Sequence, residues 1–119
     1  MLVQDYGATG FMTAYNRIGA VWAGGSQALL TGILKEEWGF HGAIVTDYAD
    51  HHKYMNGDQA LRAGGSLWMD GILNDGKFRF LTEENEAFYY HALRRTSKEV
   101  LYMYLNARAE NREYSQRMG

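Results

Sequence analysis

The chain has 119 residues, enough for one ordinary domain but well short of the roughly 250 that a complete (β/α)8 barrel needs. Hydrophobic residues make up 46% and charged residues 22%, which is a globular balance. The net charge of −2 and the lack of any Lys/Arg block give no electrostatic case for nucleic acid or for a membrane surface.

Two further classes of feature are excluded by the sequence. No apolar run approaches the ~20 residues of a membrane span, and the absence of cysteine rules out disulfides, thiolate metal sites and a cysteine nucleophile. The first residues do not show a basic region followed by an apolar stretch, so no signal peptide is expected. A cytoplasmic location is therefore the default expectation.

The first half of the chain predicts a strand, a helix and a second strand. Residues 10–16 predict a short strand, and the glycine-rich residues 19–25 predict a loop. A helix is expected over 26–38, because it begins at a serine, a favoured N-cap, and is followed by Gly39, a favoured C-cap. The apolar, β-branched run over 43–46 predicts the next strand. This order is typical of a βαβ unit with parallel strands.

The second half predicts a shorter set of elements and then one long helix. A polar loop is expected over 49–57, a helical segment over 58–63 and a third strand over 66–69. A long helix with an apolar stripe of tyrosine, leucine and valine is expected over 82–106. The polar residues 107–119 are expected to form a frayed tail.

The position that points most directly to chemistry is Asp47. It follows the apolar strand over 43–46 and precedes Tyr48. Enzymes of the α/β class place catalytic groups at the C-terminal ends of buried strands, because the loops there line the ligand crevice. The alternative is an ordinary loop or N-cap aspartate, which strand ends also carry.

Several short motifs occur in a consistent order and spacing: residues 12–18 (MTAYNRI), 29–31 (LLT), 37–42 (EWGFHG), 45–48 (VTDY), 60–65 (ALRAGG) and 92–95 (ALRR). With these motifs the chain resembles glycoside hydrolase family 3, the β-glucosidase-like enzymes. Together they span about residues 8–105, which is most of the chain.

The resemblance implies a fold as well as a family. Residues 1–106 would be the last part of a (β/α)8-type catalytic barrel, an α/β fragment of about three parallel strands with helices and a long C-terminal helix. Residues 107–119 would be the polar tail. A sheet of three parallel strands leaves two faces and two edges to protect, so we expect self-association into a homo-oligomer to complete it.

The resemblance also implies an activity and a site. The family hydrolyses β-linked sugars with retention, so the expected partner is a carbohydrate, with no cofactor, metal, nucleic acid or membrane. The family nucleophile is the aspartate of a strand-end (Ser/Thr)-Asp-(Trp/Tyr) motif, which is Asp47 here. By the same match, Tyr48 lines the sugar subsite, Tyr15 sits beside the nucleophile and Met12 packs nearby.

Two hypotheses about function remain. The first is a retaining β-glycosidase fragment with Asp47 as nucleophile, and the second is a non-catalytic, oligomeric remnant with at most weak carbohydrate binding. No residue matches the family's acid/base glutamate, and loss of general acid catalysis costs about 10²–10⁴-fold in rate. Weak or absent activity is therefore expected of the isolated chain. The nine tyrosines suit either a sugar-binding cleft or a contact surface.

Other side chains allow a functional and an ordinary interpretation. Trp22 and Trp68 suit a sugar platform, but tryptophans at such positions more often belong to the core. The pair His51 and His52 resembles a metal site, yet adjacent side chains diverge and no third ligand has suitable spacing, so loop histidines are expected. The possible second carboxylates, of which the last two fit a solvated helix face better, are Asp50, Asp70, Glu36 and Glu37.

Overall fold

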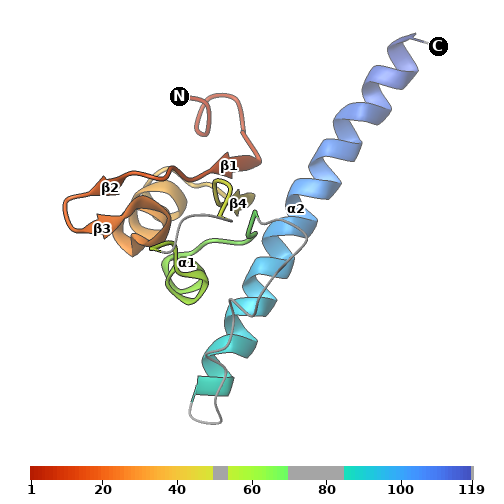
Figure 1. Ribbon diagram of the computed structural model, residues 1–119. Coiled ribbons are helices and arrows are strands. Elements are labelled where there is room, and N and C mark those ends of the chain that lie inside the picture. Colours follow the sequence, from red (N-terminus) through yellow and green to blue (C-terminus); the bar gives the residue numbers. More distant parts are fainter. Residues whose placement is uncertain (50–53, 70–84, 119) are drawn as a thin grey trace.

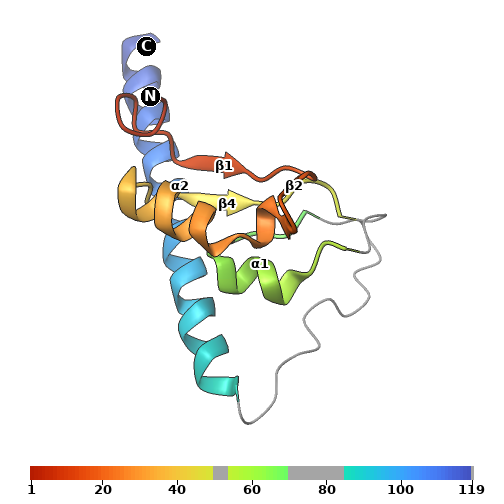
Figure 2. The same ribbon diagram turned by 90° about the vertical axis from the view of Figure 1, so that its left-hand side faces the viewer.

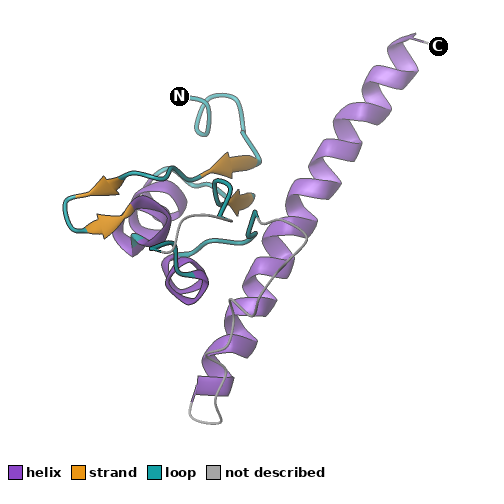
Figure 3. Cartoon of the chain, in the orientation of Figure 1, coloured by secondary structure: helices purple, strands orange, loops and turns teal. Residues whose placement is uncertain are grey.

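The computed structural model describes residues 1–49, 54–69 and 85–118, with side chains as far as residue 107. Short strands lie between helices, and one long helix runs beside them and extends beyond them at the C-terminus (Figure 1; Figure 3). In chain order the elements are β1 (Gly10–Met12), β2 (Arg17–Ile18), β3 (Val21–Trp22), η1 (Ala23–Gly25), η2 (Ala28–Glu37), β4 (Ala43–Val45), α1 (Gly57–Ala63) and α2 (Glu86–Met118).

The parallel βαβ unit predicted from the sequence is confirmed. Strands β1 and β4 pair in parallel, with Gly10 opposite Ala43 and Met12 opposite Val45, and η2 forms the crossover between them. The predicted third strand over 66–69 is reduced to one parallel bridge between Val45 and Leu67. The ladder stops there because the next donor, the Met69 amide, bonds at 2.9 Å to a side chain, the Thr46 hydroxyl oxygen.

A glycine sets how closely β1 and β4 approach one another. A Cβ atom at Gly42 would lie 1.8 Å from the carbonyl oxygen of Thr9. Only glycine therefore fits where the segments that lead into β1 and β4 meet. One residue later, the Ala43 amide donates to that same oxygen at 3.0 Å. This contact fixes the pairing register just before the ladder begins.

Helix η2 matches the prediction for residues 26–38 in position but is wound more widely than an α-helix. Its turns have π geometry, shown at the C-terminus by the Trp38 amide, which donates to the Ile33 carbonyl five residues back at 2.9 Å. The Ser26 hydroxyl accepts from the Leu29 amide at 3.3 Å, as expected of an N-cap. The buried side of η2 packs into the main core, formed by Val3, Leu30, Leu34, Phe40, Ile44 and Ala63.

The loop predicted over residues 19–25 is wrong in its first half, which forms an antiparallel hairpin. Strands β2 and β3 pair Arg17 with Trp22 and Ile18 with Val21. Gly19 has a φ of 61° at the first position of the two-residue turn, where glycine is favoured. The prediction gave the glycines too much weight, because the residues on either side of the turn are good strand formers.

Helix α2 is longer than predicted. It runs from Glu86 to Met118 instead of ending near residue 106. The sequence beyond 106 is polar, but it contains no glycine or proline before Gly119 and is rich in strong helix formers such as alanine, arginine and glutamate. Despite its length, α2 is too polar to cross a membrane, and no other helix in the described part of the chain meets that requirement.

Helix α2 lies at the end of the sheet where β1 and β4 begin, while η2 and α1 lie along one face of the strands (Figure 2). A largely buried ion pair ties it there. The Lys35 ammonium group lies 2.5 Å from Glu99 Oε1 and donates to the Gly64 carbonyl at 2.6 Å. The Ser66 hydroxyl donates to Glu99 Oε2 at 2.5 Å. Burial lowers the pKa of Lys35, and the bond to Glu99 partly opposes that effect.

This ion pair generates a prediction about stability. Replacing Glu99 with Gln leaves the Lys35 charge without its counter-ion, and breaking a buried pair in this way costs about 3–5 kcal/mol of unfolding free energy. The double variant Lys35→Met/Glu99→Met removes both charges of this pair and should recover part of that loss. The rest should remain because Arg95, whose Nε lies 3.6 Å from Glu99 Oε1, also loses its counter-ion. Urea unfolding followed by circular dichroism measures both values.

The matched control is Glu37→Gln, an exposed carboxylate on η2, which should change stability little. A double variant as unstable as Glu99→Gln alone would contradict the assignment, because the loss would then not arise from the unpaired charge.

Candidate active site

The candidate site lies where the chain leaves β1 and β4. Because the two strands are parallel and in register, both end at the same edge of the sheet. The segment after β1 carries Tyr15, and the segment after β4 carries Asp47. The Tyr15 phenol interacts with the Asp47 carboxylate, whose negative charge raises the pKa of the phenol. The structure therefore brings together two residues that stand 32 positions apart in the sequence.

The electrostatics at this edge keep Tyr15 protonated. Burial raises the pKa of its phenol, and the hydrogen bond and negative charge of Asp47 raise it further. The charge of Tyr54 adds to the increase in the Tyr15 pKa, whereas the Tyr48 backbone opposes it. The Tyr48 amide also donates to Asp47 Oδ1 at 2.7 Å. Asp47 thus lies beside a protonated phenol and accepts a hydrogen bond from the backbone.

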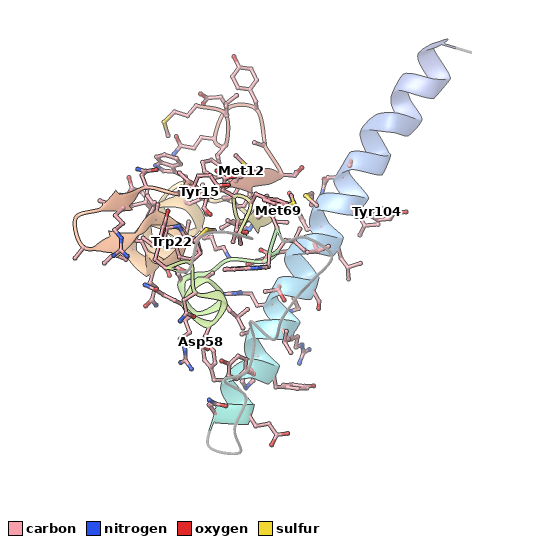
Figure 4. All side chains as sticks on the ribbon, in the orientation of Figure 1. Met12, Tyr15, Trp22, Asp58, Met69 and Tyr104 are labelled. Carbon is pink, nitrogen blue, oxygen red and sulfur yellow. The ribbon has the colours of Figure 1, made fainter. Side chains whose placement is uncertain are left out.

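The other two predicted site residues lie around this pair. Tyr48 directly follows Asp47 and is 46% exposed. Met12, opposite Val45 in the sheet, is 60% exposed and lies on the segment that leads to Tyr15 (Figure 4). Alternation along β4 puts Asp47 on the same face as Val45. An aromatic and a flexible apolar side chain are therefore available next to the carboxylate.

The face that Met12 shares with β4 is apolar and open. Its cross-strand and alternating neighbours are Val45, Leu67 and Met69, and the last two are 40% and 43% exposed. The opposite face, covered by η2, holds the fully buried Ile44. The site thus lies at the rim of an apolar surface that faces away from the main core.

A second open apolar region lies beside β1. A groove of about 250 Å³ runs between the segment that follows β1 and helix η2, and its walls include Phe11, Ile18, Leu29 and Ile33. Much of its lining comes from η2, and Met12 also lines it, whereas Asp47 does not. Both open regions adjoin the strand β1, whose one partner among the described strands is β4.

Trp22 belongs to the core and does not serve as a sugar platform. It is only 2% exposed, and its indole nitrogen donates to the Ala14 carbonyl at 3.0 Å. Trp68 meets it edge-on, with ring centroids 6.2 Å apart. With Ala49, Met55 and Ala60, Trp22 forms a second core cluster against which Tyr15 packs. Trp22 is thus a core residue, as the more common interpretation of such a tryptophan predicts. Its cluster supports the site through packing against Tyr15.

Two other carboxylates of the described chain are engaged elsewhere. Asp58 accepts from Arg62 at 2.9 Å and from the Tyr89 hydroxyl, and Glu99 belongs to the ion pair with Lys35. Glu36 and Glu37 are exposed on η2, as expected of a solvated helix face. Within the described ranges, no group of three or more acidic or histidine side chains could hold a metal ion. The remaining candidates, Asp50, His51, His52 and Asp70, lie outside the described residues.

The sequence analysis missed Tyr54. Its hydroxyl donates to the Tyr15 carbonyl at 2.9 Å, and the Arg17 guanidinium lies 5.3 Å from the centre of its ring. Tyr54 lies within a stretch that predicts only a polar loop. Its aromatic character was the one available signal, and the contact joins residues 39 positions apart.

The raised pKa of Tyr15 gives a testable prediction. Tyr15 should titrate above the usual tyrosine value of 10.0, and Asp47→Asn should bring its pKa down because the carboxylate charge is removed. Since the folded-state pKa is the higher one, this contribution to stability is complete below about pH 10 and is lost as pH rises through the folded-state pKa. NMR of ¹³Cζ-labelled tyrosine measures the titration, with Tyr15→Phe to assign the signal. A Tyr15 pKa unchanged by Asp47→Asn would contradict the interaction between the two side chains.

Comparison with known proteins shows a match to a family described as "Glycosyl hydrolase family 3 N terminal domain", over residues 1–70. A beta-glucosidase from Rhizobium radiobacter is 32% identical over 73 residues, which is 61% of this chain and 9% of that protein. An exo-alpha-(1->6)-L-arabinopyranosidase from Bifidobacterium breve is 34% identical over 74 residues, again 61% of this chain and 9% of that protein.

The fold is also similar to solved structures. A beta-glucosidase from Paenibacillus barengoltzii superposes with a TM-score of 0.70 and 27% identity, covering 88% of this chain and 13% of that one. The chain therefore spans about a tenth of the length of the curated relatives it matches. The mixed α/β arrangement with parallel strands corresponds to a portion of these larger proteins.

Proposed function

The chain belongs to glycosyl hydrolase family 3, and on that premise we propose that it carries the nucleophile side of a retaining β-glycosidase site. The observation that supports this most is the interaction between the Tyr15 phenol and the Asp47 carboxylate, which meet where two parallel strands end. A carboxylate held in this way is oriented and remains ready to attack. The proposed substrates are β-linked glucosides and related glycosides.

The proposed roles follow from the chemistry of retention. Asp47 attacks the anomeric carbon and forms a glycosyl-enzyme, while a second carboxyl group about 5–5.5 Å away protonates the leaving oxygen. Tyr15 holds the attacking carboxylate by donating a hydrogen bond to it. Tyr48 offers an aromatic surface to the sugar, and Met12 supplies an apolar contact at the rim of the site.

The acid that retention requires is proposed to come from outside the described part of residues 1–106, the partial barrel. Asp58 and Glu99 are held by their own partners, so neither is available to a substrate at Asp47. Without an acid, hydrolysis of a poor leaving group is about 10²–10⁴-fold slower. The alternative function, a non-catalytic oligomeric remnant with weak carbohydrate binding, is favoured by the same observation.

We further propose that self-association covers the open surfaces, so that the chain is a homo-oligomer. Three surfaces support this: the apolar face around Met12, the groove beside β1 and the outer side of α2. On α2, exposed apolar side chains recur at helical spacing, with Leu93 and Leu101 58% and 57% exposed. Surfaces of this kind on a soluble chain usually mark a contact with another protein.

The proposed nucleophile is tested by trapping. A 2-fluoro glycoside with a dinitrophenyl leaving group needs little acid assistance, so it should label Asp47, and intact-mass and peptide analysis should find one sugar on that residue. Dinitrophenyl β-glucoside and α-L-arabinopyranoside should be hydrolysed slowly, and Asp47→Ala should reduce both rates to that of buffer. Glu37→Gln, on the solvated face of η2, is the matched control. Equal rates for Asp47→Ala and the unmodified chain would contradict the hydrolase hypothesis and favour the alternative, a non-catalytic remnant with weak carbohydrate binding.

The proposed self-association is tested by sedimentation. The chain should sediment with a mass above the 13.6 kDa of one copy. Leu93→Lys/Leu101→Lys should shift it toward a single copy, because burying two lysines in a contact is costly. Glu37→Lys on η2 should leave the mass unchanged. A single-copy mass for the unmodified chain at all concentrations would contradict the proposal.

A further inference from the structure

The backbone that carries Tyr15 lies outside the strands and is held at three successive carbonyl groups. The Ala14 carbonyl accepts from the Trp22 indole at 3.0 Å, and the Asn16 carbonyl accepts from the Ala23 amide at 3.1 Å. The carbonyl between them, that of Tyr15 itself, accepts from the Tyr54 hydroxyl at 2.9 Å. Each of these bonds restricts the rotation of a peptide unit next to the Tyr15 side chain.

The Tyr54 bond differs from the other two in its origin. Trp22 ends β3 and Ala23 begins η1, and both residues are buried. Each lies within eight residues of its acceptor along the chain. Tyr54 comes from the chain that follows Asp47, and it reaches back over 39 residues. It therefore links the two segments whose side chains meet in the site.

A second contact orients Tyr54. The Arg17 guanidinium lies 5.3 Å from the centre of the Tyr54 ring, and its Nη1 donates to the Ala20 carbonyl at 2.8 Å in the hairpin turn. A cation over an aromatic face is an attractive, directional contact. The hairpin thus fixes Arg17, Arg17 lies against Tyr54, and Tyr54 binds the backbone of Tyr15.

From this geometry we infer that Tyr54, held by Arg17, is a positioning residue that keeps the Tyr15 phenol against the Asp47 carboxylate. Tyr54 acts through Tyr15 and has no reacting atom of its own. The inference rests on the proposed function for its catalytic meaning, since an oriented carboxylate matters most for an attacking group. Misplacement of a site residue by about 1 Å can cost roughly 10²-fold in rate.

The test measures the coupling between Tyr15 and Asp47 with and without the Tyr54 hydroxyl. The drop in the Tyr15 pKa caused by Asp47→Asn is measured by ¹³Cζ-tyrosine NMR in the unmodified chain and again in Tyr54→Phe. Any direct effect of the Tyr54 hydroxyl on Tyr15 is present in both members of each pair and cancels. A positioning role predicts a clearly smaller drop in the Tyr54→Phe background.

Two further variants make the result specific. Arg17→Lys keeps the charge but loses the planar group, so it should reduce the coupling in the same direction. Tyr6→Phe removes the hydroxyl of an 80% exposed tyrosine and should leave the coupling unchanged. Circular dichroism and urea unfolding of each variant separate a local change from a loss of fold. An undiminished drop in folded Tyr54→Phe would overturn the inference.

The outcome is independent of turnover. Loss of coupling in Tyr54→Phe together with a failure of the 2-fluoro glycoside to label Asp47 would support the positioning role and contradict the glycosidase proposal. Labelling of Asp47 at the same rate in Tyr54→Phe and in the unmodified chain, with intact coupling, would support the glycosidase proposal and contradict the positioning role.

Discussion

The site depends on the parallel register of β1 and β4. Gly42 lets the segments before β1 and β4 approach so closely that no Cβ would fit against the Thr9 carbonyl. The hydrogen-bonded ladder between the strands begins one residue later. A parallel pair in fixed register ends at one edge, so the segments that leave the two strands emerge side by side. Tyr15 and Asp47 can meet only for that reason. A slip of one residue would turn the side chains of one strand to its opposite face.

The ion pair that docks α2 and the candidate site lie at opposite ends of the same sheet. At the end where the strands begin, α2 is fastened by Lys35, Glu99 and Ser66, whose charges and hydroxyl satisfy one another away from solvent. At the other end lie Asp47 and Tyr15. The strands between them are only three residues long, so both ends rest on one short ladder and on the core beneath η2. Long-range polar bonds of this kind specify where α2 docks better than its polar sequence does.

The parts of this arrangement that follow a strong local pattern could be predicted from the sequence. The apolar run before Asp47 has the period and composition of a buried strand, and Ser26 and Gly39 bound the helix before it. The hairpin at residues 17–22 was missed because its short strands surround glycines that suggest a loop. The extent of α2 does not follow from polarity, because a polar segment of strong helix formers continues a helix as readily as it frays. Tyr54 could not be found in this way, since its partner is 39 residues distant and no local pattern records such a contact.

The open face beside Asp47 has an electrostatic consequence. As long as Met12, Leu67 and Met69 face water, the carboxylate and the phenol interact in a medium of high dielectric constant, which weakens every charge-dependent contact between them. Any surface that covers this face removes water from one side of the pair. The same interaction between the phenol and the carboxylate then acts in a lower dielectric and becomes stronger. The strength of the interaction between Tyr15 and Asp47 therefore depends on whether the apolar face beside them is covered by another surface or exposed to water.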